Sequence, residues 1–304
     1  MIKPVNFSFN AETAVNNAFQ VAGAGNDAQR QALAEFDGFV QLLRDNDVDV
    51  TVIDDTPDPY TPDSIFPNNW VSFHDDGTVC LYPMYAVNRR LERKPGVLET
   101  LSRRFRIDAT LDFSSYEKEG LFLEGTGSMV LDRDRKIAYA CTSPRTDIEV
   151  LLDFCRKMGF VHDFFTAVDA EGRSIYHTNV MMCIADRYAV VCLDALPIAA
   201  ERAHLSATIR TSGKSVIPIT LTQMNHFAGN MLQVHNQQGE KLLVMSSQAY
   251  ASLDPEQIRQ LTAFNRILHA PLTTIEMNGG GSARCMLAEI HLPKTTTDSP
   301  AGLR

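Results

Sequence analysis

The sequence lacks closely spaced cysteines and is poor in tryptophan. It has six cysteines in 304 residues and a single tryptophan, Trp70. No two cysteines form a CxxC pair, so a structural zinc site is not expected. A chain of this length can bury a sizeable core without a disulfide or a metal ion to hold it together.

Long apolar runs and an excess of positive charge are also absent. No stretch reaches the ~18 to 20 apolar residues that a membrane helix needs, and residues 1–5 lack the apolar segment of a signal peptide. The 28 basic side chains are outnumbered by 37 acidic ones, for a net charge of −9, which argues against nucleic acid or an anionic membrane as a partner. These features, with cysteines thinly spread, predict a cytoplasmic protein.

What remains is an ordinary globular composition, with 44% apolar and 21% charged residues, which excludes disorder and collagen-like repetition. The length fits two domains of about 150 residues each or one large domain. No low-complexity linker divides the chain. We therefore predict one domain over residues 1–294 and a frayed tail over 295–304.

One pattern recurs along the chain: a strand, a turn, a second strand, an amphipathic helix and a third strand. In the clearest copy the strands are predicted at 180–185, 188–193 and 215–219. Its helix is predicted at 197–210 and opens on a proline, a residue favoured in the first helical turn. The repeat predicts an α/β protein built from similar units.

Four further copies are predicted. Two of them have the full order strand, strand, helix, strand, at 128–131, 137–141, 146–158 and 160–165, and at 230–235, 241–245, 255–268 and 272–276. A third has strands at 70–74 and 79–82 and a helical stretch near 96–104, without a predicted third strand. The fifth is split between the chain ends, with strands at 285–291 and 5–9, a helix at 27–46 and a closing strand at 48–53. Such a split unit would close a ring and remove a free sheet edge.

The five units begin at regular intervals. Asn69, Glu124, His177, Asn230 and Cys285 stand at their heads, separated by 55, 53, 53 and 55 residues. A period of ~50 residues in β-rich units predicts a radial or stacked array. In a radial array these five side chains would point to the shared centre.

Cys285 has the local sequence of a reactive thiol. It follows three consecutive glycines at 279–281, which let a ligand approach the backbone closely, and it opens a short apolar run. A nucleophilic thiol needs such access. A mobile loop beside a buried, inert cysteine accounts for the same residues, and both interpretations stay open at this point.

Two other unit heads carry groups that can move protons. Glu124 lies between an apolar strand and a glycine turn, where it could bind a cation, act as a base or simply be a solvated turn residue. His177 heads its unit, where a general acid–base could reach a central site, although a lone histidine can also be structural. The long irregular segment 62–70 is of the kind that often carries function.

Together these residues resemble the guanidino-group modifying enzymes, the superfamily of arginine deiminases, dimethylarginine hydrolases and amidinotransferases. The segments PDSIFPNNW at 62–70 and GGGSARC at 279–285 are most similar to its citrulline hydrolase branch. The resemblance implies a five-bladed α/β propeller of ββαβ units, the arrangement that the repeat suggests. It implies no metal and no organic cofactor.

The resemblance also implies catalytic roles. Cys285 matches the family's nucleophile, and His177, in the sequence His-Thr-Asn, matches its catalytic histidine. Glu124 matches the acidic residue of the family's [ED]-G-G-D motif. Here that motif reads EGTG and lacks the final aspartate.

Substrate-binding residues carry over with one departure. In the P-D-x-x-F-x-E-D segment of the dimethylarginine hydrolases, Asp63 is kept, but the acidic pair has become Asn68 and Asn69. Arg89, in the segment NRRLE, and Arg145, in PRTD, match the arginines that grip the substrate carboxylate in that family. A surface charge is the alternative for each arginine.

The asparagines bear on the substrate. A guanidinium has only donors and is matched by a carboxylate, whereas a neutral ureido group also has a carbonyl acceptor. An amide at Asn69 can pair with a ureido group without burying an unpaired charge, which favours citrulline over arginine. Asn179 and Asn230 are further candidates, either for contacting the substrate or for shaping their turns.

The sequence thus predicts a cysteine-dependent hydrolase that converts citrulline to ornithine, ammonia and carbon dioxide through a covalent thio-intermediate. Arginine deiminase, dimethylarginine hydrolase or amidinotransferase activity on the same scaffold remains an alternative. A non-catalytic amino-acid binding protein is an alternative of another class. The expected partner is a small amino acid, and a homodimer is compatible with the sequence.

Overall fold

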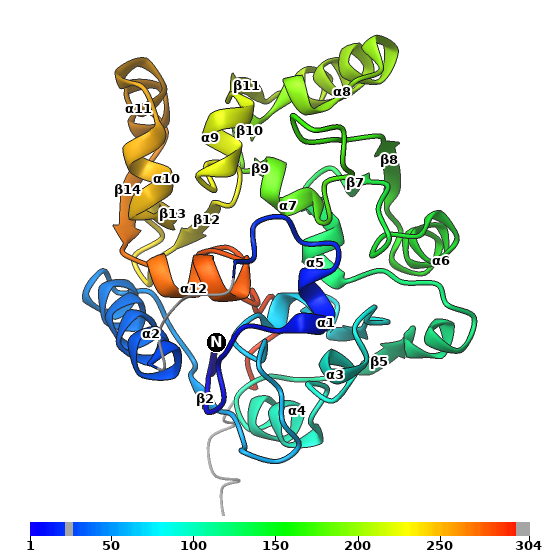
Figure 1. Ribbon diagram of the computed structural model, residues 1–304, viewed down its shortest axis with the longest axis vertical. Helices are drawn as coiled ribbons and strands as arrows, with labels where there is room; N and C mark the ends of the chain where they lie inside the picture. The colour runs from blue at the N-terminus through cyan, green and yellow to red at the C-terminus, as the bar shows by residue number, and fades with distance from the viewer. Residues whose placement is uncertain (22–26, 296–304) are drawn as a thin grey trace, which may run out of the picture.

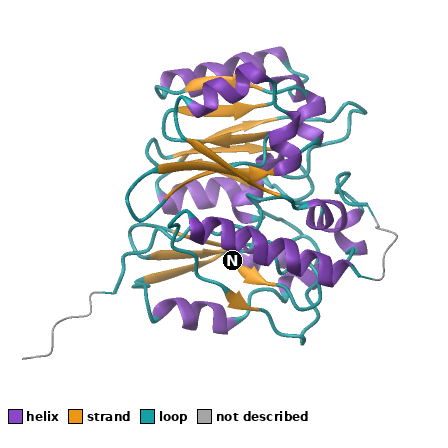
Figure 2. Ribbon diagram, turned by 90° about the vertical axis from the view of Figure 1, so that its left-hand side faces the viewer, coloured by secondary structure: helices purple, strands orange, loops and turns teal. Residues whose placement is uncertain are grey.

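Small sheets are arranged around a common centre (Figure 1). The computed structural model describes residues 1–21 and 27–295, which form four three-stranded sheets and one two-stranded pair. In every three-stranded sheet the first two strands are antiparallel and the third is parallel to the second. This is the five-unit α/β propeller that the repeat predicts. A side view shows the strands lying among the helices (Figure 2).

The strands of the described residues have the following bounds: β1 (Ile2–Lys3), β2 (Ile53–Asp54), β3 (Val71–Phe73), β4 (Thr78–Leu81), β5 (Ala109–Asp112), β6 (Met129–Asp132), β7 (Ile137–Cys141), β8 (Val161–Phe165), β9 (Met182–Ile184), β10 (Tyr188–Val191), β11 (Ser215–Pro218), β12 (Leu232–His235), β13 (Lys241–Ser246) and β14 (Arg266–Ala270). Successive triplets from β3 onward form the four larger sheets.

The helices are α1 (Ala11–Ala14), α2 (Ala28–Asp45), α3 (Val87–Arg90), α4 (Pro95–Ser102), α5 (Gly125–Ser128), α6 (Ile148–Met158), α7 (Thr178–Met181), α8 (Ala199–Thr211), α9 (Leu221–Asn225), α10 (Ser247–Ser252), α11 (Pro255–Thr262) and α12 (Thr273–Gly279), with 3-10 turns η1 (Pro67–Asn69), η2 (Ser114–Lys118) and η3 (Leu193–Ala195). The helices α2, α4, α6, α8 and α11 lie at the outside of the ring in Figure 1.

Local signals explain where the outer helices begin and end. The side chain of Asp147 accepts a hydrogen bond from the backbone N–H of Glu149 and starts α6, which ends at Gly159 with φ of 69°, a left-handed conformation that glycine adopts without a Cβ clash. Asp254 starts α11 in the same way and forms a capping box with Gln257. Both helices bury one apolar face, because Phe154 and Leu261 are completely covered.

A short turn precedes the inner strand in three units. Glu124 and His177 immediately precede α5 and α7, without a capping hydrogen bond from their side chains, and Asn69 ends η1. The inner strands therefore begin at Met129 and Met182 rather than at the predicted 128 and 180. In each of these units the head residue lies in the turn or directly before it, so it does not belong to the strand that follows.

The fourth unit departs from the prediction at its end. The predicted helix 255–268 stops at Thr262, and 266–270 is the strand β14, which pairs in parallel with β13. The predicted strand 272–276 lies instead in α12. Helix α12 packs on α2, and the carboxylate of Glu35 accepts the free N–H groups of Thr274 and Ile275 in its first turn, as helix starts require.

The fifth unit joins the two ends of the chain, but with less sheet than predicted. Its helix α2 is close to the predicted 27–46, and β1 pairs in parallel with β2. Neither 5–9 nor 285–291 forms a strand. The two segments are joined to the fold through their apolar side chains. Phe7 and Leu287 pack in one apolar cluster with residues of α2, and Ile290 packs against a second cluster that contains Ile2.

The cysteines outside the predicted site are buried and free: Cys80, Cys141, Cys155, Cys183 and Cys192. Burial raises the pKa of Cys141 to about 11, so this thiol stays protonated. No helix in the described part of the chain is long and apolar enough to cross a membrane. The predicted tail lies, apart from Thr295, outside the described residues, and the single catalytic domain stays a prediction.

Candidate active site

Most of the predicted site residues meet in one pocket of about 260 Å3. Its lining contains Cys285, His177, Asp63, Asn69, Arg89 and Arg145 from the predicted set, together with Thr13, Asn17, Phe66, Tyr176 and the glycines 279–281. All six predicted side chains are at least 97% buried. The N-terminal segment crosses the front of the ring (Figure 1), and its Thr13 and Asn17 belong to the lining of this pocket.

Cys285 is presented by the glycine loop. Gly280, with φ of 63°, ends α12, and the backbone N–H of Cys285 donates to the carbonyl of Ser282 at 2.9 Å. A Cβ on Gly281 would lie 3.0 Å from the Phe66 ring and 3.2 Å from the Cβ of Cys285. A side chain at 281 would therefore crowd the Phe66 ring and Cys285, which would have to give by a few tenths of an ångström.

Two amides face the sulfur of Cys285. Nδ2 of Asn230 lies 3.3 Å and Nδ2 of Asn179 lies 3.6 Å from Sγ. Asn230 also donates to the backbone carbonyl of Asn179 and accepts from the backbone N–H of Arg284. Both amide nitrogens are placed to donate hydrogen bonds to the sulfur. Both asparagines are thus placed against the nucleophile, whereas the pocket lining itself does not include them.

His177 and Glu124 form a buried pair. Nε2 of His177 lies 2.8 Å from Oε2 of Glu124. Burial lowers the pKa of His177 to about 4, and Glu124 counteracts this only in part, so the imidazole is neutral at neutral pH. An ionised carboxylate only accepts hydrogen bonds, so Nε2 carries the proton and Nδ1 keeps a lone pair that can take one.

Glu124 stays ionised although it is completely buried. Burial alone would raise its pKa, but the charge of Arg145 and the hydrogen bond from His177 lower the pKa well below its usual range. Oε1 also accepts the backbone N–H of Tyr85 at 2.9 Å. Glu124 therefore fixes the tautomer of His177 and can stabilise a positive charge on the ring.

Asn69 has one free donor. Its Oδ1 accepts from Nη1 of Arg89 at 2.8 Å, and its Nδ2 is buried without a hydrogen-bond partner. Because an arginine only donates, the amide oxygen must face Arg89 and the N–H2 must face the other way. A Cβ on Gly127 would lie 2.4 Å from this Nδ2 and 2.7 Å from Nδ1 of His177, so these two nitrogens are close neighbours.

Arg89 is held by a carboxylate that the sequence interpretation did not single out. Its Nε and Nη2 donate to the two oxygens of Glu92 at 2.8 and 3.0 Å, and Nη2 also donates to the carbonyl of Phe66. Burial raises the pKa of Glu92 to about 7, although Arg89 opposes the shift. Glu92 is the last residue of the segment NRRLE. Its place three residues after Arg89 in a helical turn is the sequence feature that could have predicted this ion pair.

The N-terminal segment supplies site residues that the sequence interpretation missed. Asn10 and Thr13 donate to Oδ2 of Asp63 at 2.7 and 3.1 Å, while Oδ1 of Asp63 has no partner. Burial raises the pKa of Asp63, against the lowering effect of Arg89. No local pattern marks these contacts, since Asp63 lies 53 residues from Asn10 and 50 residues from Thr13 in sequence.

Arg145 is also engaged by the N-terminal segment. Its Nε and Nη2 both donate to Oδ1 of Asn16, at 2.8 and 2.5 Å, and Nη2 donates to the carbonyl of Thr13. Nη1 lies 3.5 Å from Oε2 of Glu124. The ring of Tyr176 lies against the guanidinium at 5.2 Å, so one face of the arginine is covered.

Asn68 does not reach the pocket. Its Nδ2 donates to Oγ1 of Thr126 at 3.2 Å, and the side chain is absent from the pocket lining. In the described residues no group of three His, Cys, Asp or Glu side chains is placed to hold a metal ion.

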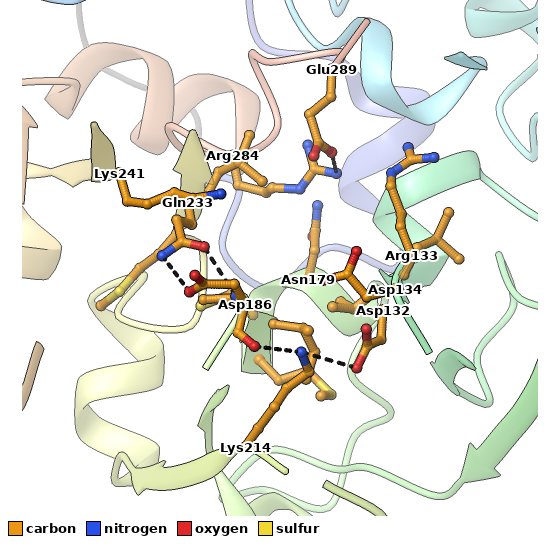
Figure 3. A pocket seen from close by; sticks show the side chains of 18 residues that line it. Asp132, Arg133, Asp134, Asn179, Asp186, Lys214, Gln233, Lys241, Arg284 and Glu289 are labelled. Carbon is orange, nitrogen blue, oxygen red and sulfur yellow. Dashed lines mark hydrogen bonds and ion pairs between the residues drawn. The ribbon is translucent and has the colours of Figure 1, made fainter. Parts of the chain in front are cut away.

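A second pocket of about 760 Å3 is lined by residues in and next to the strands β6, β9 and β12 (Figure 3). Its charged side chains largely pair with one another. Lys214 lies 3.3 Å from Asp132, and Arg284 lies 3.0 Å from Glu289. Asn179 belongs to this lining while its Nδ2 faces Cys285, so it separates the two pockets.

The family of the chain follows from its sequence. The profile of the family described as N,N dimethylarginine dimethylhydrolase, eukaryotic, matches residues 3–292. The chain belongs to this family. The resemblance to the guanidino-modifying superfamily is thereby confirmed, whereas the citrulline branch is not specifically tested. No curated protein matches the sequence.

Solved structures share the fold at low sequence identity. The N-terminal domain of ArgZ, an arginine dihydrolase from cyanobacteria, covalently bound to a reaction intermediate, matches with a TM-score of 0.74 and 18% identity over 96% of this chain and 98% of that domain. Against full-length apo ArgZ the TM-score is 0.73 at 17% identity, and the match covers 94% of this chain but only 39% of ArgZ. A dimethylarginine dimethylaminohydrolase adduct matches with a TM-score of 0.61 and 18% identity, over 86% of this chain and 92% of that one.

Proposed function

We propose that the protein is a cysteine-dependent hydrolase of a ureido amino acid, and that citrulline is converted to ornithine, ammonia and carbon dioxide. One observation carries the choice of substrate: the buried, unpartnered Nδ2 of Asn69 in the lining of the pocket that contains Cys285. A buried donor without a partner is unfavourable. A ureido carbonyl satisfies it, and a guanidinium, which has no acceptor, does not.

In the first step Sγ of Cys285 attacks the ureido carbon. Neutral His177 takes the thiol proton on Nδ1 and passes it to the departing amine, so the C–N bond breaks and ornithine leaves. The ionised Glu124 stabilises the imidazolium while it exists. The product on the enzyme is an S-carbamoyl group on Cys285, a thiocarbamate.

In the second step water attacks the carbamoyl carbon. His177 takes a proton from the water, and the C–S bond breaks to return the thiol. The carbamic acid released decomposes to ammonia and carbon dioxide. The amides of Asn179 and Asn230 donate to Sγ and so support the thiolate as it attacks and as it leaves.

The remaining pocket residues hold the amino acid. The free Oδ1 of Asp63 can accept from a substrate N–H. We propose that Arg145 binds the substrate carboxylate, because its donor pair faces a single neutral oxygen of Asn16, which a carboxylate can replace with a charged bidentate contact. Arg89 adds positive charge beside it but is already paired with Glu92.

Replacement of the nucleophile tests the enzyme class. Cys285→Ser should abolish ornithine formation from citrulline, measured by amino-acid analysis, because the neutral hydroxyl of serine is a far weaker nucleophile than a cysteine thiol. Cys141→Ser is the matched control: it removes a buried thiol outside the pocket and should retain turnover. Retained turnover in Cys285→Ser, or a wild-type Cys285 that resists alkylation by a haloacetamidine, would contradict catalysis and favour the amino-acid binding protein.

Arginine is the second candidate substrate. Three buried carboxylates, Asp63, Glu92 and Glu124, surround two arginines at this site, which leaves an excess of acid that a guanidinium would balance. ArgZ, whose structure shares this fold, is an arginine dihydrolase. Amidinotransfer would differ only in that an amine, in place of water, resolves the covalent intermediate.

A further inference from the structure

Glu92 is connected to the substrate side of the pocket although it does not line it. It is 97% buried, two residues beyond the end of α3. Both of its oxygens accept from Arg89, at 2.8 and 3.0 Å. This bidentate pairing is the strong, directional form of an arginine–carboxylate contact, so Glu92 fixes both the position and the plane of the guanidinium.

The fixed guanidinium leaves Nη1 directed at Asn69. Nη1 donates to Oδ1 of Asn69 at 2.8 Å, and Nη2 holds the carbonyl of Phe66, just before the turn that carries Asn69. The two ends of an amide are nearly equal in size, so its orientation is set by its partners. Arg89 is the partner that turns the N–H2 of Asn69 away from itself.

Two other carboxylates compete for Arg89. Oδ2 of Asp63 and Oε2 of Glu124 each lie 3.9 Å from one of its nitrogens. Without the charge of Glu92, Arg89 would be drawn toward them and away from Asn69. The amide could then rotate and present its oxygen, which is the atom that a guanidinium N–H requires.

We propose that Glu92 is a positioning residue that sets the preference of the site for a ureido over a guanidinium head group, by holding Arg89 against Asn69. This rests on the proposed function. Glu92 does not touch the substrate; it determines which end of the Asn69 amide the substrate meets.

The test compares Glu92→Gln with wild type. Glutamine keeps the size of the side chain but loses the charge and one acceptor oxygen. We expect kcat/KM for citrulline to fall by ~10-fold or more, as loss of a hydrogen bond to a charged group implies, with a smaller fall or a rise for arginine. An equal change for both substrates would overturn the proposal.

Glu117→Gln is the matched control. Glu117 pairs with Arg93 at 2.7 Å, outside the active-site pocket, so its replacement removes a comparable ion pair and should leave the citrulline-to-arginine ratio unchanged. Glu92→Asp keeps the charge and should restore part of the ratio. A ratio that shifts as much in Glu117→Gln would show that the effect is general destabilisation.

A double-mutant cycle identifies the route. In an Asn69→Ala background, Glu92→Gln should not change the ratio further, because the amide through which it acts is gone. A full additional shift there would overturn the proposed route through Asn69.

The same ratio can be read without turnover. Calorimetric Kd values for citrulline and arginine in the Cys285→Ser background test Glu92 even if wild type hydrolyses neither amino acid, an outcome that would overturn only the proposed reaction. A Kd ratio unchanged by Glu92→Gln would overturn the role of Glu92 alone. Failure to bind either amino acid would overturn both proposals.

Discussion

At the scale of the residue, Asn69 can discriminate between head groups because its neighbours leave it one bonding choice. Its oxygen is taken by Arg89 and its nitrogen is free. The sequence indicated an amide that offers both a donor and an acceptor. Which of the two faces the pocket could not be predicted, because it depends on Arg89, 20 residues along the chain, and on Glu92 behind it.

Replacement of Asn69 by aspartate should reverse the preference. Asn69→Asp removes the donor and adds a second acceptor, so we expect kcat/KM for citrulline to fall by ~10-fold or more and arginine to gain relative to citrulline. Asn68→Asp is the control: it also buries a carboxylate, but outside the pocket, and should leave the ratio of the two substrates unchanged. An unchanged ratio in Asn69→Asp would contradict the assignment of Asn69.

His177 should titrate far below an ordinary histidine. Burial lowers its pKa to about 4, so the ring should stay neutral at pH 5.5, where an unperturbed histidine is about nine-tenths protonated. The unfolded chain then binds more protons than the folded one between pH 6.5 and 4, and His177 lowers the free energy of unfolding progressively as the pH falls through this window.

NMR titration of histidine-labelled protein measures this directly. The signal of His177, assigned by its disappearance in His177→Gln, should keep the shift of a neutral ring down to pH 5. A midpoint near 6.5 would contradict the buried, neutral base on which the mechanism depends.

At the scale of the element, the short turns before the inner strands aim the site. The repeat of about 50 residues placed Glu124 and His177 correctly before the strands β6 and β9, because period and strand patterning are local signals. It also predicted a strand after Cys285, which the structure does not have. The prediction for the end of the fourth unit was wrong because no glycine or proline separates α11 from the strand at 266–270. Only pairing with β13, a non-local contact, makes that segment a strand.

Glycine at position 127 in α5 should be required for activity more than for folding. Gly127→Ala would place a Cβ 2.4 Å from Nδ2 of Asn69 and 2.7 Å from Nδ1 of His177, closer than atoms pack. Both side chains must move, so kcat/KM should fall by at least ~100-fold, the effect of a displacement of about 1 Å.

Gly38→Ala in α2 is the matched control for that variant. A Cβ there meets nothing within 4 Å, so alanine should stabilise the helix by up to ~1 kcal/mol and leave activity unchanged. Comparable activity in Gly127→Ala and Gly38→Ala would contradict the crowding of Asn69 and His177 over α5.

At the scale of the whole molecule, the ring is closed by its chain ends. The sequence predicted that closure, but it predicted strands where the structure has irregular segments. The N-terminal segment that covers the pocket was missed, since its contacts, such as Asn16 with Arg145 across 129 residues, leave no periodic pattern. Hydrogen bonds between loops that are distant in sequence cannot be predicted from one sequence alone.

Shortening the C-terminal end tests the closure. Leu292 is 96% buried, the carbonyl of Pro293 accepts from the N–H of Arg106, and the N–H of Thr295 donates to the carbonyl of Arg104. Truncation after His291 should lower the free energy of unfolding by about 3 kcal/mol, from lost burial and hydrogen bonds, measured by urea denaturation. Truncation after Thr295 keeps these contacts and should match the full chain; equal stability of all three would contradict closure through this segment.

The most direct test of the central claim is product analysis with the purified wild-type protein, offered citrulline, arginine and dimethylarginine separately. The geometry of Cys285, His177 and Asn69 predicts ornithine and ammonia from citrulline, with arginine and dimethylarginine converted more slowly or not at all. Citrulline that accumulates from arginine or dimethylarginine, and is itself left untouched, would contradict the assignment of a ureido substrate.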